Sequence, residues 1–182
     1  MRTDARLNRE RILAAAEEVF GAQGSAGSTE EVARRAEVGI ATVFRHFPTK
    51  DQLIEATLVR SFERRIELAG RLATAADPGE ALCTLVRAMI EDGPTKITLA
   101  TLISADGTVP PAAEEASHRL REAVGVVLQR AQQAKAVRSA VTVDEVYFLV
   151  RGLAQAAAAS PVSAATMSGA IDVVLTGLAG PG

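Results

Sequence analysis

Hydrophobic residues recur along this chain three or four positions apart, which is the spacing of amphipathic α-helices. The first run predicts a helix over residues 9–23, and Gly24 is placed to end it. A second short helix is predicted after Ser28, because Ser28 and Glu31 have the spacing of a capping box. The apolar positions that define these two helices are Ile12, Ala16, Val19, Phe20, Val32, Ala33 and Ala36.

Residues 38–50 predict a turn, a third short helix, a stop and a new helix start. Pro48 ends the third helix because proline lacks an N–H group, and Thr49 and Gln52 repeat the capping-box spacing. One face of this helix is an apolar stripe, and the other carries small or hydrogen-bonding side chains instead of the Glu and Lys of an ordinary solvated face. The stripe is Ile40, Val43, Phe44 and Phe47, and the opposite face is Ala41, Thr42, Arg45 and His46.

Two short helices joined by about three residues are typical of a helix-turn-helix, whose second helix enters the major groove of DNA. Lys50 lies in the first turn of the next helix, where the helix dipole disfavours a cation. Its position is favourable if a phosphate binds at that helix terminus. The alternative is an interaction module whose helix-turn-helix has lost DNA binding.

Three runs in residues 8–56 resemble the TetR (tetracycline-repressor-like) family of transcriptional regulators: R-I-L-A-A-A-x-x-V-F, E-E-V-A-R-R-A and R-H-F-P-T-K-D-Q-L. The resemblance implies a helix-turn-helix DNA-binding domain over residues 1–49. It implies a larger helical effector-binding and dimerisation domain over residues 50–182, which begins with a connecting helix over 50–74. The implied function is that of a homodimeric repressor, released from a near-palindromic double-stranded DNA operator by a small-molecule effector.

The resemblance also implies roles for individual residues. Thr29 and Lys50 would contact phosphates. Phe44 stands where the family usually has Tyr, so one phosphate contact through a hydroxyl is expected to be missing. Glu37 stands where the family usually has Gly, which predicts a turn without a left-handed residue and a negative charge near the DNA. The residues expected to face bases or the adjacent backbone are Gly39, Ile40, Ala41, Thr42, Phe44, Arg45 and His46.

Beyond residue 74, the pattern predicts helices over 78–92, 95–105, 110–136, 142–159 and 163–178. A strand stays possible over 96–104 because β-branched residues are frequent there. The last two helices are apolar on more than one face, so we expect both sides to be buried, one of them against a second subunit. The alternative is a buried hairpin within a monomer. The predicted interface residues are Val146, Leu149, Val150, Leu153, Ile171, Val174, Leu175 and Leu178.

An effector pocket among the fourth to seventh helices follows from the resemblance. Each candidate residue has the alternative role of filling the core, since Met and aromatic residues at helical spacing usually do so. Aromatic residues and inward charges are few, which favours an apolar or weakly polar effector. The candidates are Phe62, Met89, Ile103, His118 and Tyr147.

Composition agrees with an all-α protein of about nine helices. The chain of 182 residues has 35 alanines, five Phe, one Tyr and no Trp, which favours helices over sheets. Its net charge of −2 is unusual for a DNA-binding protein. Arginines do crowd the first eleven residues, where they could form an arm along the DNA or a solvated disordered tail. These arginines are Arg2, Arg6, Arg9 and Arg11.

Catalytic and metal-binding motifs are missing from the sequence. The two histidines, His46 and His118, lack the partners of a metal or nucleophile motif, so we expect neither an enzyme nor a cofactor or metal. Cys83 is the one cysteine and is expected to pack in the core, with redox sensing as the alternative. No signal peptide or apolar run of spanning length is present, which predicts a cytoplasmic protein that does not enter a membrane.

Overall fold

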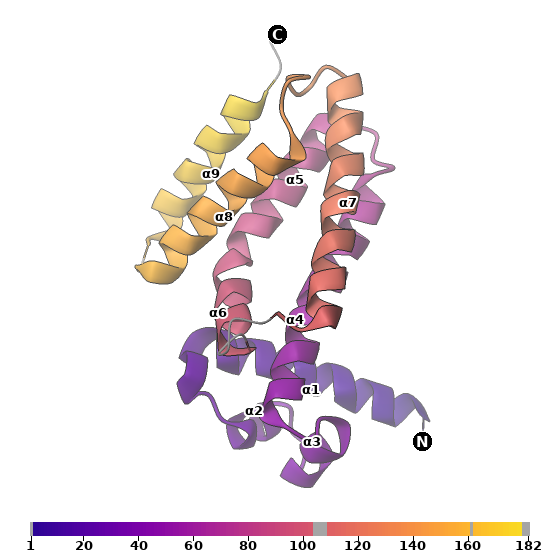
Figure 1. Ribbon diagram of the computed structural model, residues 1–182, viewed down its shortest axis with the longest axis vertical. Coiled ribbons are helices and arrows are strands. Elements are labelled where there is room, and N and C mark those ends of the chain that lie inside the picture. The colour runs from indigo at the N-terminus through magenta and orange to yellow at the C-terminus, as the bar shows by residue number, and fades with distance from the viewer. Residues whose placement is uncertain (1, 104–108, 161, 180–182) are drawn as a thin grey trace. The chain divides into compact units, whose positions relative to one another are not determined.

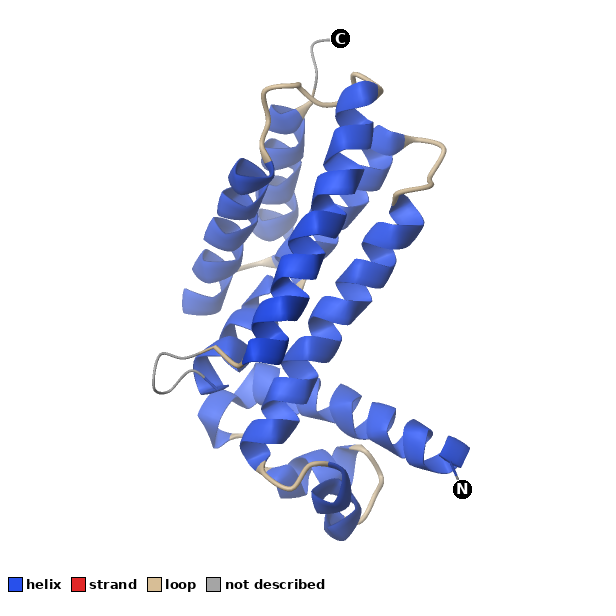
Figure 2. Ribbon diagram, turned by 45° about the vertical axis from the view of Figure 1, so that its right-hand side comes forward, coloured by secondary structure: helices blue, strands red, loops and turns tan. Residues whose placement is uncertain are grey.

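The computed structural model describes residues 2–103, 109–160 and 162–179, and within these ranges the chain forms nine α-helices and one short 3-10 helix (Figure 1). Figure 2 shows helices and loops with no strand in the described part. The all-α prediction is confirmed. The chain divides into two compact units, one made of residues 1–61 and 95–114, the other of residues 62–94 and 115–182.

The first unit contains the predicted helix-turn-helix. Helix α1 (Arg2–Gln23) leads through the 3-10 turn η1 (Gly24–Ala26) to α2 (Thr29–Arg35) and α3 (Ile40–His46), and α4 (Lys50–Leu72) begins directly after Pro48 and Thr49. Helix α1 packs on α2, and α2 packs on α3. The largest fully buried side chains of this unit are Ile12, Leu13, Phe20, Leu53, Ile54, Leu58 and Leu99.

Helix α1 begins at Arg2, seven residues earlier than the predicted start. The N-terminal arginines therefore belong to a helix and not to a disordered tail, and their contact with DNA stays a prediction. Asp4 in the first turn favours this start because a carboxylate complements the positive end of the helix dipole. The guanidinium of Arg9 lies 5.3 Å from the centre of the Phe47 ring, which ties α1 to the end of α3.

The second unit combines part of α4 with α5 (Pro78–Glu91), most of α7 (Pro111–Gln133), α8 (Val143–Ala159) and α9 (Ala164–Leu178). Asp77, Thr142 and Ser163 cap the N-termini of α5, α8 and α9 with their side chains. Helix α6 (Gly93–Ile103) occupies the segment where a strand was possible, so that alternative is wrong up to Ile103. Ser104 lies outside the described residues. The buried Leu99 anchors α6 despite its β-branched content, because packing overrides intrinsic propensity.

The core of the second unit is one continuous cluster of apolar side chains, to which α4, α5, α7, α8 and α9 all contribute. Ion pairs on its surface join distant segments: Arg119 with Glu63 at 2.7 Å, and Arg87 with Asp172 at 2.6 Å. No helix in the described part of the chain is long and apolar enough to span a membrane. The largest fully buried members of the cluster are Leu82, Leu85, Ile90, Leu120 and Ile171.

Candidate functional site

Helix α3 presents two apolar side chains to solvent. Val43 and Phe47 are buried at 0% and 4% exposure, whereas Ile40 and Phe44 are 37% and 43% exposed. The four predicted apolar positions therefore do not share one environment: Val43 and Phe47 pack in the core of the unit, whereas Ile40 and Phe44 face solvent. Exposed aliphatic and aromatic groups on a helix that enters the major groove can contact thymine methyl groups.

Arg45 is the exposed cation of α3, and no acidic side chain pairs with it among the described residues. Ala41 is also exposed, while Thr42 and His46 are half-buried. Gly39 caps the helix with an extended backbone, and a side chain added there would meet nothing within 4 Å. The exposed face of α3 therefore combines apolar contacts, small residues and one available guanidinium.

The arginines of α2 are bound by acids of the same unit. Arg34 pairs with Glu31 at 2.6 Å, and Arg35 pairs with Glu18 at 2.8 Å and with Glu31 at 3.3 Å. The hydrogen bond from Arg34 holds the pKa of Glu31 down at about 2. The Glu31 carboxylate therefore stays ionised and paired with Arg34 and Arg35. This explains why Ser28 accepts from the Glu31 N–H but only half of the predicted capping box forms.

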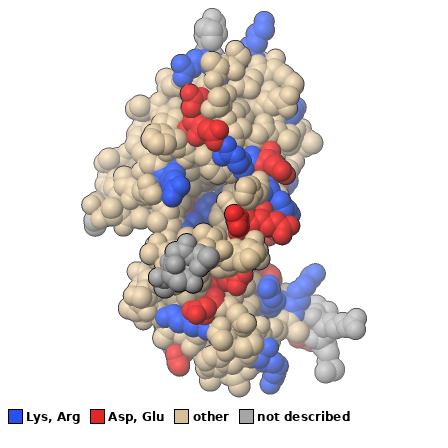
Figure 3. Space-filling view, viewed as in Figure 1, with Lys and Arg blue, Asp and Glu red and all other residues tan. Residues whose placement is uncertain are grey.

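Figure 3 shows Lys and Arg side chains (blue) and Asp and Glu side chains (red) interspersed over the face in view. A wide basic face of the kind expected for a DNA-binding protein is not visible there.

The Lys50 ammonium makes hydrogen bonds within its own unit. Its ammonium donates to the carbonyl oxygens of Gly27 at 2.6 Å and Ser25 at 3.2 Å, and it lies 5.3 Å from the centre of the Phe20 ring. An ammonium has three donors, so these two bonds leave one for a phosphate. The Thr29 hydroxyl donates to Glu30 at 3.3 Å. The phosphate contacts of Lys50 and Thr29 remain predictions.

Glu37 adopts a left-handed backbone, with φ of 53°. The prediction of a turn without a left-handed residue is therefore wrong. The Glu37 N–H donates to the carbonyl of Arg34, and the Val38 N–H donates to that of Ala33, which is the Schellman ending of a helix. This ending needs a positive φ after the helix whichever residue stands there. The Glu37 carboxylate accepts from Arg11 at 2.5 Å.

We expect Glu37→Gly to stabilise the protein by about 0.5–1 kcal/mol, since glycine adopts this backbone without the steric cost of a Cβ. The corresponding rise in melting temperature is roughly 1–4 °C for a chain of this size. Glu37→Gln is the matched control: it removes the charge, keeps the backbone cost and should not raise the melting temperature. A lower melting temperature for Glu37→Gly than for Glu37→Gln would contradict the assignment of strain to this turn.

The predicted interface residues fall into two groups in the structure. Val146, Val150, Ile171 and Leu178 are buried in the core of their own unit, whereas Leu149 is 37% exposed. Leu153, Val174 and Leu175 are half-buried. The most exposed apolar side chains of α8 and α9 are Phe148 at 80% and Val173 at 73%, neither of which was among the predicted residues. A signal was present on α9, where the residues one turn from Val173 carry no charge, whereas Phe148 on α8 lies one turn from Asp144, Glu145 and Arg151.

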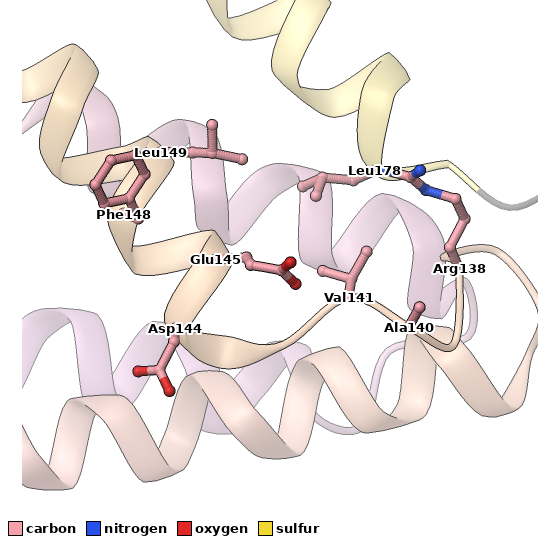
Figure 4. Close-up of a pocket in the computed structure, with 8 residues that line it drawn as sticks. All are labelled: Arg138, Ala140, Val141, Asp144, Glu145, Phe148, Leu149 and Leu178. Carbon is pink, nitrogen blue, oxygen red and sulfur yellow. The ribbon is translucent and has the colours of Figure 1, made fainter.

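A cavity of about 550 Å³ adjoins this exposed face. Figure 4 shows Phe148 and Leu149 of α8 on one side, Leu178 of α9 above, and Val141 and Arg138 from the preceding loop. Its remaining lining residues are Ala140, Asp144 and Glu145.

Three of the five pocket candidates lie in the apolar cluster of the second unit. Met89 is buried at 2%, and Phe62 and Tyr147 are half-buried against the same cluster. His118 is exposed, so the structure does not bring it into that cluster. Ile103 belongs to the first unit. Burial raises the pKa of the Tyr147 hydroxyl to about 12.

Cys83 is half-buried on α5, where desolvation raises the pKa of its thiol. A higher pKa lowers the thiolate fraction, which disfavours a redox sensor. No group of three or more His, Cys, Asp or Glu side chains is arranged to hold a metal ion in the described part of the chain.

Comparison with known proteins gave two family matches. The model described as "Bacterial regulatory proteins, tetR family" matches residues 12–57, and the model described as "Transcriptional regulator SbtR-like, C-terminal domain" matches residues 77–180. The second match covers more than half of the chain. A search of curated proteins gave no match.

Several solved structures are similar over nearly the whole chain. A TetR transcriptional regulator from Streptomyces coelicolor has 28% sequence identity and a TM-score of 0.84, with 96% of this chain and 99% of that one covered. A TetR transcription regulatory protein from Mycobacterium vanbaalenii has 32% identity and a TM-score of 0.80, with 98% of each chain covered.

Proposed function

The chain belongs to the TetR family, whose members are DNA-binding transcription regulators and not enzymes, and we propose that it is a homodimeric repressor released from its operator by a small-molecule effector. In this proposal, residues 1–49 bind DNA and residues 50–182 bind the effector and the second subunit. The operator is near-palindromic, because a two-fold symmetric dimer places two copies of α3 in successive major grooves.

The exposed face of α3 is the observation that carries DNA binding. Val43 and Phe47 fix the helix to the core, while Ile40, Phe44 and Arg45 stay available to bases and phosphates. The arrangement combines apolar contacts to thymine methyl groups with a guanidinium, the group that most often reads guanine.

Dimerisation through α8 and α9 is supported by their exposed apolar face. Phe148 and Val173 are largely solvent-exposed, and Gly152, Gly169 and Gly177 have open space where a side chain would stand. Small residues on an exposed helix face allow another helix to approach closely. A second copy of the same face would cover the apolar side chains of the first, which is an isologous interface.

Effector binding is supported by the cluster around Phe62, Met89 and Tyr147 in the second unit. Helix α4 follows α3 directly along the chain and contributes residues to both units, as α6 and α7 also do, so we propose it as the segment through which an effector alters DNA binding. A related fold from Mycobacterium smegmatis, LfrR, was solved in complex with proflavine. It is 22% identical to this chain with a TM-score of 0.67, which is a likeness of fold and leaves the effector of this chain open.

The test is selection from genomic DNA. Purified protein is incubated with fragmented DNA of its source genome at about 150 mM salt, where non-specific phosphate binding is weak, and the bound fragments are sequenced. We expect one sharp two-fold symmetric site. Diffuse recovery that disappears at higher salt would contradict sequence-specific regulation and favour the interaction module. A reporter gene placed behind the recovered site then tests repression, since an activator would raise its expression.

A further inference from the structure

The hydroxyl of Tyr147 is buried and has no hydrogen-bond partner among the residues that the structure describes. Tyr147 lies on α8 and packs against the apolar cluster of the second unit. Buried polar atoms without partners are rare in native proteins, because the desolvation of the group is then uncompensated. The position therefore requires an explanation beyond packing, which a phenylalanine would provide equally well.

The charged groups near Tyr147 do not supply the partner. The guanidinium of Arg121 lies 5.4 Å from the centre of the ring, but arginine only donates hydrogen bonds. Asp144 is paired with Arg121, and its side chain is 81% exposed, so it is directed to solvent and away from the buried hydroxyl. The apolar side chains against which Tyr147 packs offer no acceptor either.

A bound water molecule fits these surroundings poorly. Buried waters make about three hydrogen bonds, and the apolar side chains of the cluster offer none of them. A mainly apolar molecule that carries one acceptor atom fits better, since its body would contact the cluster and its acceptor would receive the Tyr147 hydrogen bond. The raised pKa keeps the hydroxyl protonated at neutral pH, so it can act as a donor.

We propose that the Tyr147 hydroxyl donates a hydrogen bond to a neutral acceptor, such as a ketone or ester oxygen, of a mainly apolar effector bound in the second unit. This inference rests on the proposed function as an effector-responsive regulator. It assigns the chemical class of the ligand: an uncharged, largely hydrocarbon molecule with an acceptor oxygen. A pure hydrocarbon or a permanent cation would leave the hydroxyl unsatisfied.

The experiment uses a matched pair of probes, acetophenone and ethylbenzene, which share a ring and differ by the carbonyl oxygen. Tyr147 is the only tyrosine in the chain, so tyrosine labelled with ¹³C at Cζ gives a single signal that reports this side chain. We expect acetophenone to shift that signal and, by calorimetry, to bind about tenfold more tightly than ethylbenzene, as one buried hydrogen bond implies. In Tyr147→Phe the preference should disappear while ethylbenzene affinity stays unchanged.

Thr57→Val is the control for loss of a hydroxyl. The Thr57 hydroxyl is buried and donates to the Leu53 carbonyl at 2.7 Å, so its removal should lower the melting temperature. Tyr147→Phe should leave the melting temperature equal or higher, because no hydrogen bond within the described part of the protein is lost. A decrease like that of Thr57→Val would overturn the proposal, because the hydroxyl would then have a partner in the folded protein.

Two further outcomes separate this inference from the proposed function. Equal binding of both probes, or no binding of either at millimolar concentrations, overturns the acceptor site. A clear preference for acetophenone that never changes operator affinity supports the site and contradicts the effector response. The two proposals can therefore fail independently.

Discussion

Arg45→Ala is expected to weaken operator binding by about 10- to 100-fold, the equivalent of one lost guanidinium contact to a base or phosphate. Arg45 is exposed on α3, and no acid pairs with it among the described residues, so its charge is available to DNA. Its loss should leave the melting temperature nearly unchanged. The measurement is a binding titration on the recovered operator at several salt concentrations.

The salt dependence tells which contact was lost. A phosphate contact lowers the slope of log affinity against log salt by about one, whereas a base contact leaves the slope unchanged and relaxes specificity at one position. Arg34→Ala is the matched control. Arg34 is exposed too, but Glu31 holds its guanidinium at 2.6 Å, so we expect a much smaller change. Equal losses for the two variants would contradict the special role of Arg45.

Val173→Asp is expected to convert the proposed homodimer to a monomer. Val173 is 73% exposed on α9 and lies four residues from Gly169 and from Gly177, on the face proposed to meet a second subunit. Two-fold symmetry would bury two new carboxylates close together in one interface, at a cost of several kcal/mol. Sedimentation at micromolar concentration should then report the mass of one chain.

Loss of the dimer should also lower operator affinity by 100-fold or more. Two linked DNA-binding helices bind about 10²- to 10⁴-fold more tightly than one. Val126→Asp is the matched control, since Val126 is a 50% exposed valine on α7 of the same unit. It introduces the same charge away from the proposed interface and should leave both the dimer and operator binding intact. A Val173→Asp protein that stays dimeric would place the interface elsewhere.

Residue spacing was sufficient to predict the helices and the helix-turn-helix, since helical periodicity, caps and proline stops are local properties. The bounds of α2, α3 and α4 follow from Ser28, Pro48 and Thr49, whose effects extend over one turn of chain. The start of α1 was predicted seven residues late, because the polar residues at its beginning lack the apolar period on which the prediction relied.

Tertiary structure alone decided which apolar residues are core and which are surface. Periodicity put Ile40 and Phe44 in one stripe with Val43 and Phe47, yet only the latter pair is buried. On α8 and α9 both faces are apolar, so periodicity could not distinguish the buried Val146 from the exposed Phe148.

The sequence by itself thus determined the class of fold, the order of the helices and the position of the helix-turn-helix. The partners of Lys50, the left-handed Glu37, the pairing of Arg34 and Arg35 with acids, and the unsatisfied Tyr147 hydroxyl became visible only in three dimensions. The physical reason is that each of them depends on groups brought together by packing or on the geometry of the folded chain, whereas helix formation depends on neighbours within a few residues.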